Sequence, residues 1–113
     1  MITQAQVNAR MAIERAIIQK LIDVALATGW EIPYVWDGEE RQHCIDGKAV
    51  MDAVFSVDEC AIHFRKFGVA RTVVCIVLGN DGYDVISDNS IQETFQAEVM
   101  DAVEAFAETF EPS

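Results

Sequence analysis

The spacing of apolar residues changes along the chain between a helical period and a strand period. From Val7 to Leu26 they recur three and four positions apart, which predicts a long N-terminal helix. Thr3 and Gln6 match a capping box at its start, and Gly29 is a typical stop signal. The apolar arc covers more than half of the predicted helix surface. The helix is therefore expected either to lie between layers or to contact another subunit.

A period of two replaces the helical period after Gly29. The segment from Trp30 to Trp36 alternates, which predicts a strand with its large side chains on one face. Pro33 cannot donate to a strand ladder, so this strand is expected at a sheet edge. The turn signal Asp37-Gly38 follows. A return strand is predicted over residues 41–45 and a short helix over residues 48–55.

The second half of the chain predicts more strands and a final helix. We expect strands at 60–64, 72–78 and 83–87. The strand at 72–78 is apolar on both faces, which predicts a central strand covered on both sides. Ser90 and Glu93 match a second capping box, and the helix they open is expected to end near Phe110. The order α-β-β-α-β-β-β-α predicts one α+β domain over residues 1–113, with an antiparallel sheet of about four to five strands.

Charge is distributed unevenly along the sequence. The chain has 113 residues and a formal net charge of −11, yet Lys, Arg and His are all absent after Arg71. The acids of this last part are Asp81, Asp84, Asp88, Glu93, Glu98, Asp101, Glu104, Glu108 and Glu111. Net negative charge argues against direct binding to nucleic acid and to anionic membranes. It favours a basic protein as partner.

Most of these acids lie on one face of the predicted C-terminal helix, opposite its apolar stripe. At about 100° per residue they share a single arc. One interpretation is a solvated face that keeps the protein soluble, and the other is a surface for a basic partner. The candidate partner-binding residues are Glu98, Asp101, Glu104, Glu108 and Glu111. A second candidate interface is the aromatic stripe Trp30, Tyr34 and Trp36, because Trp and Tyr are common in binding hot spots. The alternative interpretation is that this stripe belongs to the hydrophobic core.

Cysteine and histidine supply the remaining candidate chemistry. Cys44, Cys60 and Cys75 are widely spaced, which is typical of reduced thiols in a cytosolic protein. His43-Cys44 and Cys60-x-x-His63 offer ligands for zinc or a Cys–His nucleophile pair. Residues three apart in a strand point to opposite faces, however, and no third orienting group stands out. We therefore predict no catalytic residue, no metal and no cofactor.

Other motifs favour the same conclusion. The segment from Asn80 to Asp84 superficially matches a calcium loop, but it lacks the full ligand series, and a hairpin turn explains it better. The first residues lack a basic start followed by an apolar run, so no signal peptide is expected. No stretch of 18 apolar residues predicts a membrane span, and a cytoplasmic location is expected.

The segment Leu78-Gly79-Asn80-Asp81-Gly82-Tyr83-Asp84-Val85-Ile86-Ser87-Asp88 resembles part of a group of small uncharacterised proteins encoded by bacteriophages and prophages. In that group a similar strand precedes an acidic C-terminal helix, so the resemblance covers about residues 78–113. It implies a bacterial cytoplasm and an accessory role, and no site residue is carried over.

These observations predict a non-enzymatic interaction protein. Its acidic C-terminal helix would bind a basic surface of a host protein, as an inhibitor or nucleic-acid mimic of a host-defence factor. The alternative is a homodimeric structural or accessory domain whose acidic face serves solubility.

Overall fold

The computed structural model describes residues 3–79, 85–90 and 92–110. Its first elements are α1 (Gln4–Ala27), β1 (Glu31–Trp36), β2 (Arg41–His43), α2 (Gly47–Val54), β3 (Glu59–Lys66), β4 (Ala70–Val77) and β5 (Ile86–Ser90). A continuous helical segment follows, made of α3 (Glu93–Phe95), the π-helical turn η1 (Gln96–Met100) and α4 (Asp101–Glu108). This order confirms the predicted α+β class.

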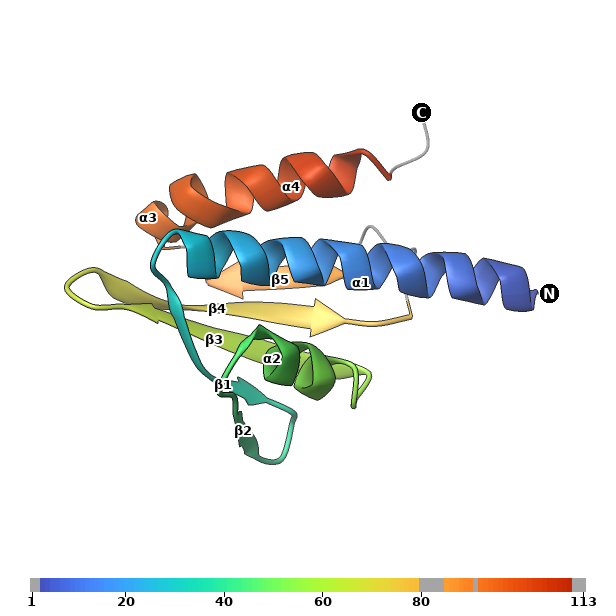
Figure 1. The fold of residues 1–113 in the computed structure, drawn as a ribbon, viewed down its shortest axis with the longest axis horizontal. Coiled ribbons are helices and arrows are strands. Elements are labelled where there is room, and N and C mark those ends of the chain that lie inside the picture. The colour runs from blue at the N-terminus through green and yellow to red at the C-terminus, as the bar shows by residue number, and fades with distance from the viewer. Residues whose placement is uncertain (1–2, 80–84, 91, 111–113) are drawn as a thin grey trace.

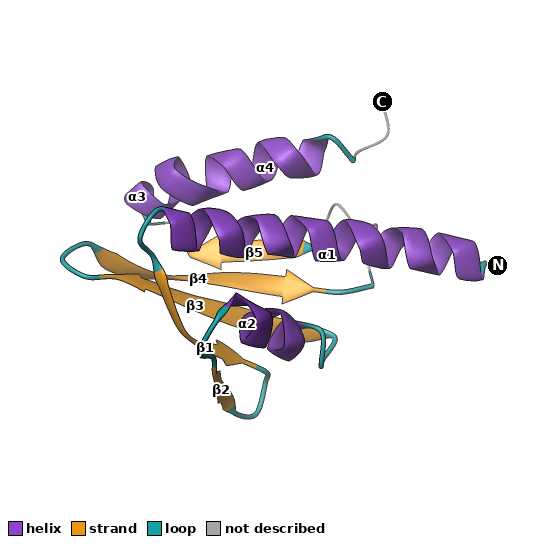
Figure 2. Cartoon of the chain, viewed as in Figure 1, coloured by secondary structure: helices purple, strands orange, loops and turns teal. Residues whose placement is uncertain are grey.

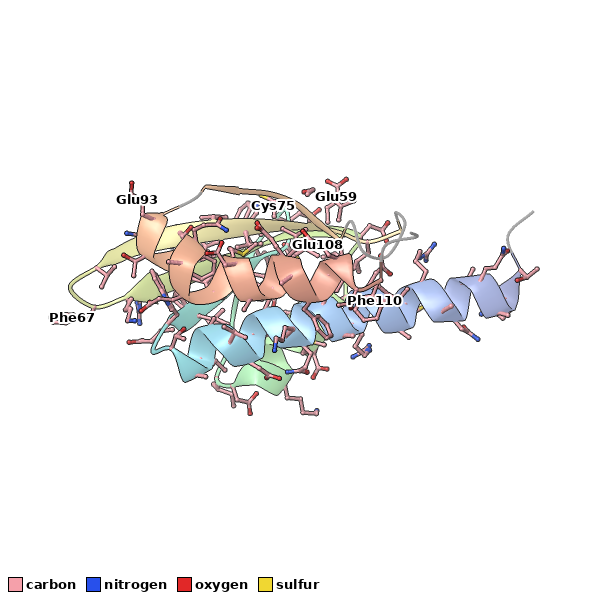
Figure 3. The ribbon with its side chains drawn as sticks, turned by 90° about the horizontal axis from the view of Figure 1, so that it is seen from above. Glu59, Phe67, Cys75, Glu93, Glu108 and Phe110 are labelled. Atoms are coloured by element: carbon pink, nitrogen blue, oxygen red, sulfur yellow. The ribbon has the colours of Figure 1, made fainter. Side chains whose placement is uncertain are left out.

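The five strands form one antiparallel sheet in the order β2-β1-β3-β4-β5. The helices all lie on one side of this sheet (Figures 1 and 2). No described element covers its other face, on which Cys75 is seen (Figure 3). The expectation that residues 72–78 are covered on both sides is therefore wrong. Val74 is buried beneath the helices, whereas Val73 and Cys75 on the uncovered face are only partly buried.

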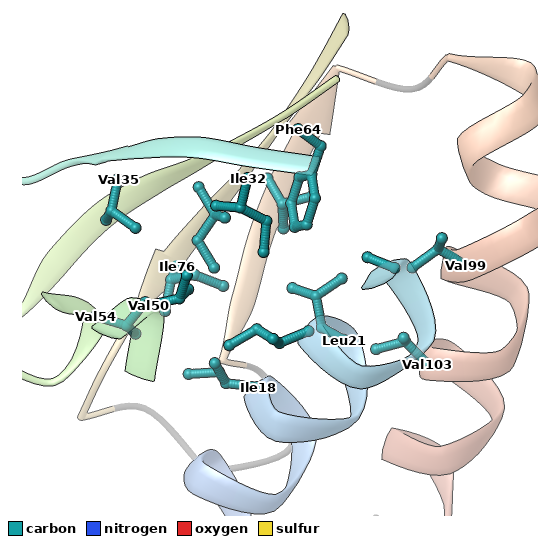
Figure 4. Packing of buried hydrophobic residues seen from close by; sticks show 14 of the residues in the cluster. Ile18, Leu21, Ile32, Val35, Val50, Val54, Phe64, Ile76, Val99 and Val103 are labelled. Atoms are coloured by element: carbon teal, nitrogen blue, oxygen red, sulfur yellow. The ribbon is translucent and has the colours of Figure 1, made fainter. Parts of the chain in front are cut away.

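The hydrophobic core fills the space between the sheet and the helices. Phe64 and Ile76 reach into it from the sheet, Leu21 from α1, and Val99 from the C-terminal helical segment (Figure 4). Helix α1 packs against α2 and α4 as well as the core, which buries the middle of its wide apolar arc. Met11 and Leu26, near the two ends of the arc, remain 46% and 45% exposed.

Local signals account for the start and end of α1. The Thr3 hydroxyl accepts a hydrogen bond from the Gln6 amide, and the Gln6 side chain accepts one from the Thr3 amide, which confirms the capping box. Gly29 follows with a φ of +90°, a conformation that favours glycine.

The prediction of a second capping box at Ser90 and Glu93 is wrong. Ser90 pairs with Val73 in the β4–β5 ladder, and the Gln92 side chain caps the helix by accepting from the Phe95 amide. The ladder therefore extends through Ser90, and the helix begins after it. The strand expected at 83–87 lies at 86–90 instead, and residues 80–84, with the calcium-like motif, lie outside the described residues.

The strand β1 also departs from expectation, because it lies between β2 and β3 and not at an edge. Pro33 is accommodated by a register shift between Glu31 and Tyr34 in the β1–β3 pairing. Strand β2 pairs only with residues 34–36 of β1, so the ladder with β2 requires no donor from Pro33. A local irregularity thus allows proline within an inner strand.

Candidate functional site

The acidic side chains predicted to share one surface do not all lie together. Asp101, Glu104 and Glu108 on α4 are exposed, and we call these three residues the α4 acidic face. Glu93 is exposed at the other end of the helical segment, well apart from Glu108 (Figure 3). Glu111 lies outside the described residues. Glu98 belongs to a different environment.

Glu98 connects the C-terminal helical segment to the sheet and to the end of α1. Its carboxylate accepts a hydrogen bond from Trp30 Nε1 at 3.0 Å and another from Lys66 Nζ at 2.8 Å. Lys66 Nζ also donates to the Thr28 carbonyl at 2.7 Å. The indole of Trp30 packs edge-on against Phe95, with ring centroids 5.0 Å apart. Glu98 is therefore occupied by the fold and is removed from the candidate partner-binding residues.

The π-helical turn explains why Glu98 leaves the predicted arc. Residues 96–100 form a wider turn than an α-helix, so each residue there rotates by less than the angle of about 100° used for the prediction. This difference turns Glu98 away from the α4 acids and toward Lys66. The sequence offered no signal for the wider turn.

None of the three residues of the α4 acidic face forms an ion pair with a described residue, although Lys20 Nζ lies 5.7 Å from the ring centroid of Phe106 on the same helix. The acids that form ion pairs with described residues are Glu14, Glu31, Asp52 and Glu98. The Gln96 amide nitrogen lies 2.7 Å from Asp101 and 3.3 Å from Glu104, and it supplies only a neutral donor. The carboxylates of α4 therefore repel one another at helical spacing, each pair at a cost of about 0.3 kcal/mol.

The Glu98 contacts predict a pH dependence of stability. The hydrogen bond from Lys66, followed by that from Trp30, lowers the pKa of Glu98 below its ordinary value of 4.5. Because the pKa is lower in the folded state, the stabilisation is complete above the unfolded pKa and is lost as pH falls through the folded pKa. Urea unfolding from about pH 7 down to about pH 3 should show a smaller loss for Glu98→Gln than for the original chain.

Backbone hydrogen bonds from Glu40 and Glu39 lower the pKa of Asp37. Protonation of Asp37 should therefore destabilise the variant and the original chain equally over the same pH range. The difference between the two curves therefore isolates Glu98. Parallel curves for the variant and the original chain would contradict the assigned role of Glu98.

The aromatic stripe predicted on one face is divided between two faces. Trp30 is 1% exposed and lies in the core, because the irregularity at Pro33 interrupts the alternation. Tyr34 and Trp36 lie on the uncovered face of the sheet, where Trp36 is 39% exposed. Trp30 is therefore removed from the second candidate interface.

The uncovered face also carries cations that the sequence analysis did not assign. His63 stacks on Tyr34 with ring centroids 4.2 Å apart, and the Arg41 guanidinium lies 4.9 Å from the Tyr34 ring centroid. Burial, and then the charge of Arg41, lower the pKa of His63. Arg65 and Arg71 are direct cross-strand partners. Alternation in β3 could have placed His63 and Arg65 on one face, but Arg41 and Arg71 join them only through strand register.

The cysteine and histidine side chains are arranged as the strand alternation predicts. Cys60 points into the core and His63 to the uncovered face. Burial raises the pKa of the Cys60 thiol to about 12, so it is protonated at neutral pH. The Cys44 thiol contacts the Gln42 carbonyl at 3.2 Å. Within residues 3–79, 85–90 and 92–110, no three His, Cys, Asp or Glu side chains are grouped to hold a metal.

The fold and these surfaces define a small α+β protein with an acidic helical side and a sheet face that carries aromatic rings and three arginines. No model of a protein family matches the sequence, and no match was found among curated proteins or solved structures. In the part of the chain that the structure describes, no helix is long and apolar enough to cross a membrane.

Proposed function

We propose that this protein is a non-enzymatic binding module whose α4 acidic face docks on a basic surface of another protein. The observation that carries the proposal is the contrast between acids used by the fold and acids left exposed. Glu14 and Glu98 each form an ion pair, whereas Asp101, Glu104 and Glu108 form none with a described residue. A partner's Lys or Arg side chains would relieve the repulsion along α4.

The position of the acids on the helix supports the same proposal. Glu108 lies in the last turn of α4, where negative charge opposes the helix dipole. A cationic partner at this end would offset the unfavourable interaction of Glu108 with the helix dipole. It would also reduce the repulsion among the carboxylates. In the setting implied by the sequence resemblance, the partner is a bacterial host protein, and the module acts as its inhibitor or as a nucleic-acid mimic.

Charge reversal tests this proposal. We expect Asp101→Lys, Glu104→Lys and Glu108→Lys together to weaken partner binding by about tenfold or more, since three favourable charge interactions become repulsive. The partner is first captured from bacterial lysate by the immobilised original chain and eluted with salt. Its affinity for each variant is then measured at low and high salt, with circular dichroism to check folding.

The matched control is a triple change of exposed acids outside the helix, Glu39→Lys, Glu40→Lys and Asp58→Lys. Each triple changes the formal charge from −11 to −5, because every acid-to-lysine change adds two positive units. The control should retain the partner. Equal loss in both triples, or equal binding of the original chain at low and high salt, would overturn the proposal.

A homodimer is the second candidate, and one observation favours it. The first turns of α1 project beyond the sheet (Figure 1), and Met11 there is 46% exposed although it is apolar. A second copy could cover this segment, with the acids serving solubility. Light scattering on the same samples separates the two candidates, because a molar mass equal to that of the monomer at every protein concentration would exclude the homodimer.

A further inference from the structure

The sheet face opposite the helices has a composition unlike the rest of the molecule. Residues paired across antiparallel strands point to the same side. The register joins Trp36 with Arg41, Tyr34 with His63, and Arg65 with Arg71, so all of these side chains share the uncovered face. We call the part of this surface that carries Tyr34, Trp36, Arg41, His63, Arg65 and Arg71 the open sheet face. Glu31, opposite Arg65, lies beside it, and Glu59, opposite Val77, lies at the far end of β3 from Arg65.

Positive charge on the open sheet face is only partly balanced. Arg65 and Arg71 oppose each other directly across β3 and β4, an arrangement that is unfavourable for like charges. Arg65 forms an ion pair with Glu31 at 3.2 Å, whereas neither Arg41 nor Arg71 has an ion pair with a described residue. Arg15 and Lys20 on α1 likewise form no ion pair with a described residue, so what distinguishes Arg41 and Arg71 is that they share a face with Arg65. A bound anion would stabilise this arrangement.

Flat aromatic surface lies beside these cations. The Tyr34 and His63 rings are stacked with an interplanar angle of 28°, and Arg41 covers part of Tyr34. Trp36 adds a second half-exposed ring two residues along the same strand face. A groove of about 560 Å³ runs along the face, with Tyr34, His63, Arg41, Arg65 and Arg71 in its lining.

The tip of the β3–β4 hairpin extends this surface. Phe67 is 100% exposed and projects from the end of the molecule (Figure 3). Val69 beside it is 43% exposed. A second groove of about 550 Å³ is lined by Phe67 and Val69 together with Arg65 and Arg71, which also line the first groove. Lys66 anchors the base of the tip through Glu98 and the Thr28 carbonyl.

We propose that the open sheet face and the hairpin tip bind single-stranded nucleic acid. The backbone phosphates would contact Arg41, Arg65 and Arg71, since a guanidinium matches phosphate geometry. The bases would stack on the exposed rings of Trp36 and Phe67 and on the Tyr34–His63 pair. Cationic grooves combined with stacking rings are the usual means of binding single strands.

The separation of charge within the molecule answers the objection from the net charge of −11. The α4 acids lie on the helical side of the sheet, whereas Arg41, Arg65 and Arg71 lie on its uncovered face and Phe67 projects from the hairpin tip (Figure 3). At physiological salt the Debye length is about 8 Å, so solvent-exposed charges farther apart than this are largely screened from one another. The local arginines then determine what binds to this face. The sequence-based expectation of no direct nucleic-acid binding rested on the total charge alone.

Fluorescence anisotropy with a labelled oligothymidylate of about ten nucleotides tests the proposal on the full chain. We expect saturable binding that weakens with salt. Arg41→Gln with Arg71→Gln should raise Kd about tenfold or more. Phe67→Ser should raise Kd about fivefold or more, as expected for the loss of one stacked base. Phe67 has no buried surface to lose, so this variant keeps the fold.

The matched control for the arginine pair is Arg15→Gln with Lys48→Gln, which removes the same charge from the helices and should leave Kd within about twofold. No binding at about 100 µM protein, the upper end of the non-specific range, would overturn the proposal. An equal effect of the control pair would also overturn it. So would displacement of the oligonucleotide by polyglutamate of the same length and charge, because the site would then be one for acidic protein.

Discussion

Replacing Trp30 with alanine should lower the free energy of unfolding by about 3–5 kcal/mol. Trp30 is 1% exposed, and its ring packs against Phe95 while its Nε1 donates to Glu98. Truncation leaves a large cavity where α1, β3 and the C-terminal helical segment meet. Urea unfolding measures the loss, and the melting temperature should fall by about 15 °C, since each kcal/mol corresponds to about 4 °C at this size.

Trp30→Phe separates the packing of the ring from its hydrogen bond. Phenylalanine retains most of the buried ring and removes the donor to Glu98, which keeps its contact with Lys66. We expect this variant to lose about 1–2 kcal/mol, less than half of the alanine effect. If both variants lose the same stability, the hydrogen bond and not the packing holds these elements together.

Replacing Glu14 with alanine should lower the free energy of unfolding by about 2–3 kcal/mol. This carboxylate is 2% exposed and accepts a hydrogen bond from the Gly79 amide at 2.7 Å, which ties α1 to the end of β4. Arg10 Nε lies 3.6 Å away, an ionic contact too long for a hydrogen bond. The alanine variant leaves the Gly79 amide without its acceptor.

Glu14→Gln is the matched variant, because its amide oxygen can still accept from Gly79. We expect a loss of about 1 kcal/mol, since the charge interaction with the partly exposed Arg10 is given up. Urea unfolding of the three proteins gives the comparison. A glutamine variant as unstable as the alanine variant would show that charge, and not the Gly79 hydrogen bond, is the main contribution of Glu14.

Local patterns predicted the elements because the physical signals for them are local. The capping box at Thr3 and the alternation of β3 depend on neighbouring residues only, and both are confirmed. The helix start predicted at Ser90 is wrong because strand pairing is not local, and the ladder with β4 extends β5 through this residue. The edge position predicted from Pro33 is wrong because a register shift, which the sequence does not show, allows proline in an inner strand.

The candidate sites show the same division. Sequence periodicity correctly placed Asp101, Glu104 and Glu108 on an exposed helix face. It could not separate Glu98 from them, because the π-helical turn and the position of Lys66 are set by packing. Nor could it assemble the open sheet face, whose arginines come from three strands and meet only through register.

By itself the sequence determined the α+β order of elements, the buried stripe of α1 and the excess of acid in the last third. Each follows from residues close together in the chain, whose spacing or composition carries the information. Only the tertiary structure decided which charges remain available. Packing brings Lys66 to Glu98 and leaves the α4 acids without an ion pair among the described residues, and strand pairing gathers Arg41, Arg65 and Arg71 on one face. The charge of a surface depends on which residues lie close together in space, and the net charge of the chain does not show this.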